Sequence, residues 1–163
     1  MEPLAVAVHA IANIAQLRAN QSVAVFGAGP VGLLCMAVAR ALGASRIVAV
    51  DIVPSRLEFA RQYAGAETYV PLQMQVGPES EDTLAYSLRN AKAMMEQLGI
   101  GARGPSGIDL AVDASGVEVS IQTGILVAKH GGMFVQVGVT VYGTVARLAL
   151  ACYPGDDASH RTT

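Results

Sequence analysis

A glycine-rich turn between two apolar segments constrains this chain more than any other feature of its sequence. Residues 23–26, VAVF, form a short apolar run that is typical of a strand buried on both faces. Residues 27–32, GAGPVG, follow at once and open a long apolar stretch with helical spacing. A second apolar run, residues 47–50, ends at Asp51, 19 residues after Gly32. This order of strand, glycine turn, helix, strand and acidic residue predicts a βαβ unit that binds a dinucleotide.

Each glycine of the turn has a separate physical task in such a unit. Gly27 allows the tight turn out of the strand, and Gly29 lets a pyrophosphate approach the backbone. Gly32 lets the helix pack closely on the strand. Pro30 and Val31 begin that helix, whose free N–H groups and positive dipole end would face the phosphates. We therefore expect residues 27 and 29–32 to bind the cofactor.

Asp51 is expected to accept hydrogen bonds from the 2′- and 3′-hydroxyls of the adenosine ribose. Its negative charge would repel a 2′-phosphate, so the sequence favours NAD over NADP. Arg56, five residues further on, either lies over the adenine edge or is a solvated helix residue. A tight turn in an unrelated βαβ unit would explain Gly27 and Gly32, but it gives no reason for Gly29 or Asp51.

Two more apolar runs, residues 108–112 and 133–137, read as buried strands. In a parallel sheet of this kind, ligands bind at the carboxyl ends of the strands. The small or short residues at these two ends complete the predicted cofactor site. They are Ser115, Gly116, Val137 and Gly138. Asp113, between the first run and Ser115, is expected to cap the helix that follows.

The remaining elements are read from periodicity and from helix end signals. We expect helices over residues 3–17, 54–63 and 117–129, and a short strand over residues 67–70. Ser80 is the expected N-cap of a further helix. The apolar face of that helix would carry Leu84, Leu88, Met95 and Leu98.

The predicted fold is α/β, with a doubly wound, mostly parallel sheet covered by helices on both faces. The expected strand order is 3-2-1-4-5-6, with the last strand missing or doubtful. We expect one domain over the 163 residues: a leading helix and linker (1–20), a core (22–139) and a tail without an assigned role (140–163). Without a sixth strand, the fifth would be an exposed edge that favours pairing with another chain, as in a homo-oligomer.

Composition excludes several classes of protein. A content of 52% hydrophobic and 15% charged residues is that of a globular chain. The net charge of −2 and the lack of a basic cluster argue against nucleic-acid binding. The apolar run at residues 30–42 is too short for a bilayer and contains Arg40. Cys35 and Cys152 have no metal-binding spacing, and no signal peptide is evident, so we expect a cytoplasmic protein.

Several local phrases, in this order, resemble one family. They are EPLAV (2–6), GAGPVGLL (27–34), IVAVD (47–51), DASG (113–116) and GGMFVQVG (131–138). Together they look like the medium-chain zinc-dependent alcohol dehydrogenases, and most of all the polyol branch of sorbitol, xylitol and L-arabinitol dehydrogenases. The resemblance covers most of residues 2–139. The EPL phrase, about 25 residues ahead of the glycines, makes it specific.

The resemblance implies an NAD-binding domain of an oxidoreductase that acts on polyols. In that family a separate catalytic domain holds the zinc, which polarises the alcohol oxygen for hydride transfer to NAD. Here only Glu2 matches a residue at or near that zinc, and a catalytic zinc site needs about three protein ligands. We therefore expect a fragment that binds no zinc and has no catalytic residue. It would oxidise a polyol only if a catalytic domain were supplied.

Other functions remain open on the sequence. The chain could be a stand-alone NAD-binding module that regulates without catalysis. A methyltransferase that uses S-adenosylmethionine fits less well, because such proteins usually carry an acidic residue just before the glycines and residues 23–26 have none. An FAD-binding protein is also disfavoured, since no second motif of the FAD type is evident.

Overall fold

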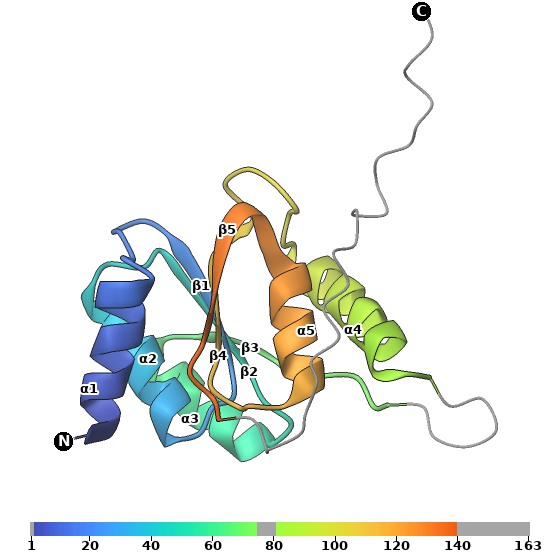
Figure 1. Cartoon of the computed structure of the whole chain (residues 1–163), viewed down its shortest axis with the longest axis horizontal. Helices are drawn as coiled ribbons and strands as arrows, with labels where there is room; N and C mark the ends of the chain where they lie inside the picture. Colours follow the sequence, from blue (N-terminus) through green and yellow to red (C-terminus); the bar gives the residue numbers. More distant parts are fainter. Residues whose placement is uncertain (1, 75–80, 140–163) are drawn as a thin grey trace, which may run out of the picture.

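The computed structural model describes residues 2–74 and 81–139, which form a parallel sheet between two layers of helices (Figure 1). The strand order is β3-β2-β1-β4-β5. The strands are β1 (Ser22–Phe26), β2 (Arg46–Val50), β3 (Glu67–Tyr69), β4 (Ile108–Asp113) and β5 (Ala128–Gln136). The helices are α1 (Glu2–Val8) with its π-helical continuation η1 (His9–Ile14), α2 (Pro30–Ala41), α3 (Pro54–Ala64), α4 (Thr83–Leu98) and α5 (Glu118–Val127).

This order confirms the predicted doubly wound α/β fold for its first five strands. The doubtful sixth strand falls in the tail of residues 140–163, outside the described residues. Among the helices of residues 2–74 and 81–139, none has the length and hydrophobicity that a membrane span requires.

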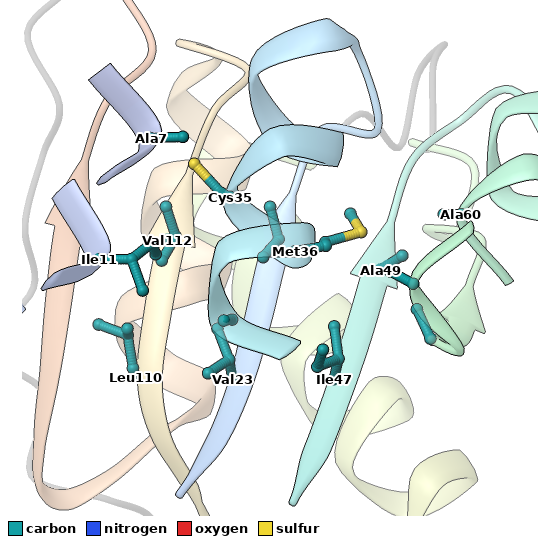
Figure 2. Packing of buried hydrophobic residues seen from close by; sticks show 14 of the residues in the cluster. Ala7, Ile11, Val23, Cys35, Met36, Ile47, Ala49, Ala60, Leu110 and Val112 are labelled. Atoms are coloured by element: carbon teal, nitrogen blue, oxygen red, sulfur yellow. The ribbon is translucent and has the colours of Figure 1, made fainter. Parts of the chain in front are cut away.

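β1 is buried on both faces, as its apolar sequence predicts. Side chains alternate between the two faces of a strand. Val23 and Val25 therefore pack against α1, α2 and α3, whereas Ala24 and Phe26 pack toward α4 and α5. Figure 2 shows the first of these layers, in which Met36 of α2 lies over the sheet. Helices cover both faces of the sheet, and the loops that follow several strands meet at the carboxyl ends of those strands.

The ends of the helices follow local sequence signals. Pro30 and Pro54 lie in the first turns of α2 and α3, where a missing N–H costs nothing. The N-cap of α4 is Asp82 and not Ser80, which lies outside the described residues. The Asp82 carboxylate accepts a hydrogen bond of 2.6 Å from the backbone N–H of Ala85.

The predicted apolar face of α4 is wrong in part. Met95 and Leu98 pack against the core, as expected, but Leu88 is 38% exposed. The buried residues of α4 are Tyr86, Ser87, Asn90, Ala91 and Met94. The physical reason is that α4 packs against α5 through polar contacts. The Ser87 hydroxyl, for example, donates to Gln122 Oε1 over 2.8 Å. A buried polar side chain with partners costs little, so the face need not be apolar.

The passage from α5 to β5 also differs from the expectation. α5 ends at Val127 and not at residue 129, and β5 begins with the next residue, ahead of the expected start at residue 133. The pairing with β4 shifts between Ile108 and Leu110, and Gly131 has a φ of 78° within the strand. Gly131 thus lies at an irregular start of β5 and does not separate the strand from the helix.

Candidate nucleotide-binding site

A pocket of about 370 Å³ lies at the carboxyl ends of the strands. The turn after β1, the loop from β2 to α3 and the loop from β4 to α5 contribute to its wall, together with α4 and α5. The predicted site residues that line it are Gly27, Gly29, Asp51, Arg56 and Ser115. Three separate segments of the predicted site thus meet in one concave surface.

The glycine turn is packed tightly on one side and open on the other. Gly27 has a φ of 99°, and a Cβ there would lie 3.1 Å from the backbone of Ala114 and Ser115. A Cβ on Gly32 would lie 1.8 Å from the carbonyl oxygen of Gly27, so only glycine fits. A Cβ on Gly29 would meet nothing within 4 Å. Gly29 therefore faces open space, as a residue approached by a ligand would.

The N-terminus of α2 lies beside this open space. Its N-cap, Gly29, has no side chain to cap the helix, and the first turn holds no acidic residue. Helix geometry leaves the first N–H groups without intrahelical carbonyl partners, and these include those of Val31 and Gly32. Such a helix end stabilises a phosphate group through its N–H groups and its dipole.

Asp51 is nearly buried, with 6% of its side chain exposed. Its Oδ2 accepts a hydrogen bond of 2.7 Å from the Ala28 N–H, and its Oδ1 accepts one of 2.8 Å from the Val53 N–H. Arg56 lies on the first turn of α3, and its Nη1 is 3.7 Å from Asp51 Oδ2. The Arg56 side chain is 56% exposed, so it forms the outer rim of the pocket beside Asp51.

Asp113 does not cap α5, contrary to the expectation. Its Oδ1 accepts hydrogen bonds from the N–H and hydroxyl of Ser115, and its Oδ2 accepts one of 2.9 Å from the Gly116 N–H. The N-cap of α5 is Val117, without a side-chain cap. The Asp113 carboxylate binds the loop at Ser115 and Gly116, before the helix begins, and so it does not cap α5.

Val137 and Gly138 do not line the pocket. Their N–H groups donate to the Asp113 carbonyl over 2.7 and 2.9 Å. A Cβ on Gly138 would lie 2.2 Å from the Gly116 nitrogen, so these two glycines let the ends of β4 and β5 meet closely. Pro30, Val31, Gly32 and Gly116 likewise support the pocket without lining it.

Several lining residues were not predicted from the sequence. Ile52, Pro71 and Val117 give the pocket apolar walls beyond Asp51, and Ile52 is 75% exposed. The position of Ile52 directly after Asp51 was the one available signal. Tyr86, Asn90, Ser120 and Thr123 come from α4 and α5 and form a polar inner end.

The inner end of the pocket is polar but uncharged. Burial raises the pKa of Tyr86, with Arg89 lowering it and Glu81 raising it further, so the phenol stays protonated. Its hydroxyl donates to the Leu72 carbonyl over 2.7 Å. Asn90 Oδ1 accepts hydrogen bonds of 3.0 Å from the Tyr69 hydroxyl and the Leu72 N–H. The side chains of Tyr86 and Asn90 thus form a neutral surface whose polar atoms make hydrogen bonds within the protein.

Glu2, the predicted remnant of a metal site, is an exposed residue at the start of α1. Across residues 2–74 and 81–139, no three histidine, cysteine, aspartate or glutamate side chains gather in a group that could hold a metal ion. The described residues therefore do not fit a zinc ion.

Comparisons with known proteins agree on one family. A family model described as zinc-binding dehydrogenase matches residues 30–154. D-xylulose reductase A of Aspergillus niger is 48% identical over 139 residues, which cover 85% of this chain and 34% of that protein. Probable D-xylulose reductase A of Aspergillus clavatus is 47% identical over the same shares of both chains. The chain thus spans about a third of the length of these relatives.

Solved structures of dehydrogenases are also similar to this chain. The 2R,3R-butanediol dehydrogenase of Bacillus subtilis is 30% identical with a TM-score of 0.65, over 88% of this chain and 35% of that one. The benzyl alcohol dehydrogenase of Acinetobacter calcoaceticus is 28% identical with a TM-score of 0.68, over 91% and 35%.

Proposed function

Because the chain belongs to the zinc-binding dehydrogenase family, we propose that it binds NAD(H) as the nucleotide-binding part of a zinc-dependent polyol dehydrogenase. The observation that carries this proposal is the pocket in which Gly29, Asp51 and the loop at Ser115 meet. The curated relatives that are named D-xylulose reductases support a polyol and its ketose as the substrate pair.

The residues of the pocket divide naturally among the parts of the cofactor. The open space at Gly29, next to the N-terminus of α2, suits the pyrophosphate. Asp51 suits the adenosine ribose, and the walls at Ile52 and Val117 suit the two faces of the adenine. When bound, NAD supplies a nicotinamide ring that accepts or donates a hydride. The described residues bind and orient it.

A stand-alone NAD-binding module is the second candidate. The observation in its favour is that this chain alone supplies the glycine turn, the acidic residue and both apolar walls of the pocket. Binding would then need no other domain. β5 is the last strand on its side of the described sheet, and its pairing with a second copy stays a prediction for either function.

Calorimetric titration of the purified chain with NADH and NADPH tests the proposal. We expect NADH to bind at least tenfold more tightly than NADPH, because the Asp51 carboxylate would lie against the 2′-phosphate. Absence of binding by both cofactors, in a chain whose circular dichroism shows a folded state, would contradict the proposal.

A second assay asks whether the chain is active by itself. Xylitol oxidation would be followed as NADH formation, with and without added zinc. Oxidation that depends on zinc would argue for an active dehydrogenase and against the stand-alone module, whereas binding without oxidation agrees with both candidates.

A further inference from the structure

The glycine turn is joined to the end of β2 by two consecutive backbone amides. The Gly27 N–H donates to the Val50 carbonyl over 2.7 Å, which continues the ladder between β1 and β2. The next amide, that of Ala28, donates to Asp51 Oδ2, also over 2.7 Å. The Asp51 side chain thus takes the place of a backbone carbonyl at the point where the chain leaves the sheet.

The Ala28 amide depends on this carboxylate. Ala28 is 1% exposed, so water does not satisfy its N–H. A buried N–H without an acceptor is costly, and a charged acceptor makes a stronger hydrogen bond than a neutral one. The conformation of the turn at Ala28 is therefore coupled to the presence of an acceptor at position 51.

The carboxylate is itself fixed before any ligand arrives. Its Oδ1 accepts the Val53 N–H over 2.8 Å, and the Arg56 guanidinium lies 3.7 Å from Oδ2. Rotation of the side chain would break one backbone hydrogen bond or the other. A carboxylate offers about four acceptor positions. The two backbone donors therefore leave room for hydroxyl groups of a ribose.

We propose that Asp51 is a positioning residue for the phosphate site as well as a contact for the ribose. It holds Ala28, and through Ala28 it sets the position of Gly29 and of the N-terminus of α2. This inference rests on the proposed function, since it concerns how the same pocket binds its nucleotide. Loss of the carboxylate would then weaken binding of the diphosphate even in a ligand without ribose hydroxyls.

Two nucleotides separate this role from simple ribose recognition. ADP carries both ribose hydroxyls, and 2′,3′-dideoxy-ADP lacks both but keeps the diphosphate. We expect Asp51→Ala to weaken the binding of 2′,3′-dideoxy-ADP at least threefold, as measured by calorimetry. Removal of a negative charge should by itself strengthen the binding of a diphosphate, so a loss of affinity would not be a charge effect. A loss smaller than threefold would overturn the proposal, because the carboxylate would then serve the hydroxyls alone.

The conservative variant Asp51→Asn sharpens the test. Its amide oxygen still accepts one hydrogen bond, so it can hold the Ala28 N–H without a charge. We expect it to retain more affinity for 2′,3′-dideoxy-ADP than Asp51→Ala does. Equal losses in the two variants would mean that the turn does not need an acceptor here, and would also overturn the proposal.

A measurement without ligand keeps this inference separate from the proposed function. Amide hydrogen exchange, read by NMR in the free chain, reports on the Ala28 N–H directly. We expect Asp51→Ala to raise its exchange rate at least tenfold relative to the amides of Ala24 and Val25 in β1. An unchanged ratio would contradict the positioning role, even if neither nucleotide binds and the proposed function fails.

Asp109→Ala is the matched control. Its carboxylate also accepts a backbone N–H, that of Ser22, over 2.8 Å, but at the amino end of β1. We expect this variant to leave both the Ala28 exchange ratio and the nucleotide affinities unchanged. Equal effects of the two variants would mean that general destabilisation explains the result, and would overturn the proposal.

Discussion

Asp113 is fully buried, and each of its carboxylate oxygens accepts at least one hydrogen bond. Three hydrogen bonds from Ser115 and Gly116 satisfy it, and no lysine or arginine is among them. Together with Asp51, it places a charged acceptor at each strand next to β1. The loops around the glycine turn therefore depend on two carboxylates that bind backbone groups.

Replacement of Asp113 by alanine should destabilise the fold. The N–H groups of Ser115 and Gly116 would lose their acceptor in a partly buried loop, at a cost of about 2–3 kcal/mol. Urea unfolding measures the change. Asp82→Ala, which removes the N-cap of α4, is the control and should cost only about 1 kcal/mol. If Asp113→Ala lowers the unfolding free energy by less than the control does, the loop does not need this carboxylate.

Cys35 should be chemically inert in the folded chain. Burial raises the pKa of its thiol to about 11, so very little reactive thiolate exists near pH 8. In a Cys152→Ser background, we expect a disulfide reagent to modify Cys35 only as fast as the chain unfolds. Rapid modification of the folded chain at pH 8 would contradict the buried position of Cys35 in α2.

Among the elements, β4 and β5 are joined by an ion pair at their amino ends. Asp109 of β4 contacts Lys129 of β5 and also accepts hydrogen bonds from Ser22 of β1. Burial raises the pKa of Asp109, but the contacts with Lys129 and Ser22 outweigh it and leave the pKa below its ordinary value. A lowered pKa in the folded state stabilises the fold at pH values where the carboxylate is ionised.

This pair predicts a pH dependence of stability. The difference in unfolding free energy between the wild type and Asp109→Asn should be fully present at pH 6. It should shrink as the pH falls below about 4, since the unfolded chain then takes up a proton and the folded pair is lost on further acidification. Chemical unfolding at a series of pH values gives this difference directly. A difference that grows on acidification would contradict the assignment.

Most of the lining residues that the sequence predicts lie close together along the chain, and the exception, Ser115, is predicted because it follows the end of a buried strand. Gly29 and Asp51 belong to one βαβ unit, whose spacing is set by one strand and one helix. Tyr86, Asn90 and Thr123 were missed because they come from α4 and α5. Which residues of two packed helices face a pocket depends on their crossing, and periodicity does not reveal this.

The errors have a related cause. Periodicity predicts Leu88 on the buried face of α4, but hydrogen bonds to polar residues of α5 bring Ser87 and Asn90 to that face instead. The position of Asp113 ahead of a helix predicts that it caps that helix. Its actual donors, Ser115 and Gly116, depend on how the loop folds back over β4. Sequence signals for helix caps do not show whether a carboxylate binds the N–H groups of a helix or those of the loop before it.

Across the whole described molecule, the sheet separates two apolar layers, and the loops at its carboxyl edge enclose the pocket. This arrangement places the site where strand ends, a helix N-terminus and polar helix faces converge. The chain spans about a third of its relatives, so the proposed polyol chemistry needs groups beyond those described. Nucleotide binding is the function that we propose for the described part by itself.

Gly29→Val tests that claim most directly. A Cβ at Gly29 meets nothing within 4 Å and its φ of −76° suits valine, so the variant should fold with a melting temperature close to that of the wild type. The side chain would fill the space proposed for the pyrophosphate. We predict that NADH binding, followed by its fluorescence, weakens at least tenfold, while the exposed control Lys92→Ala binds normally. Binding by folded Gly29→Val within twofold of the wild type would contradict the account.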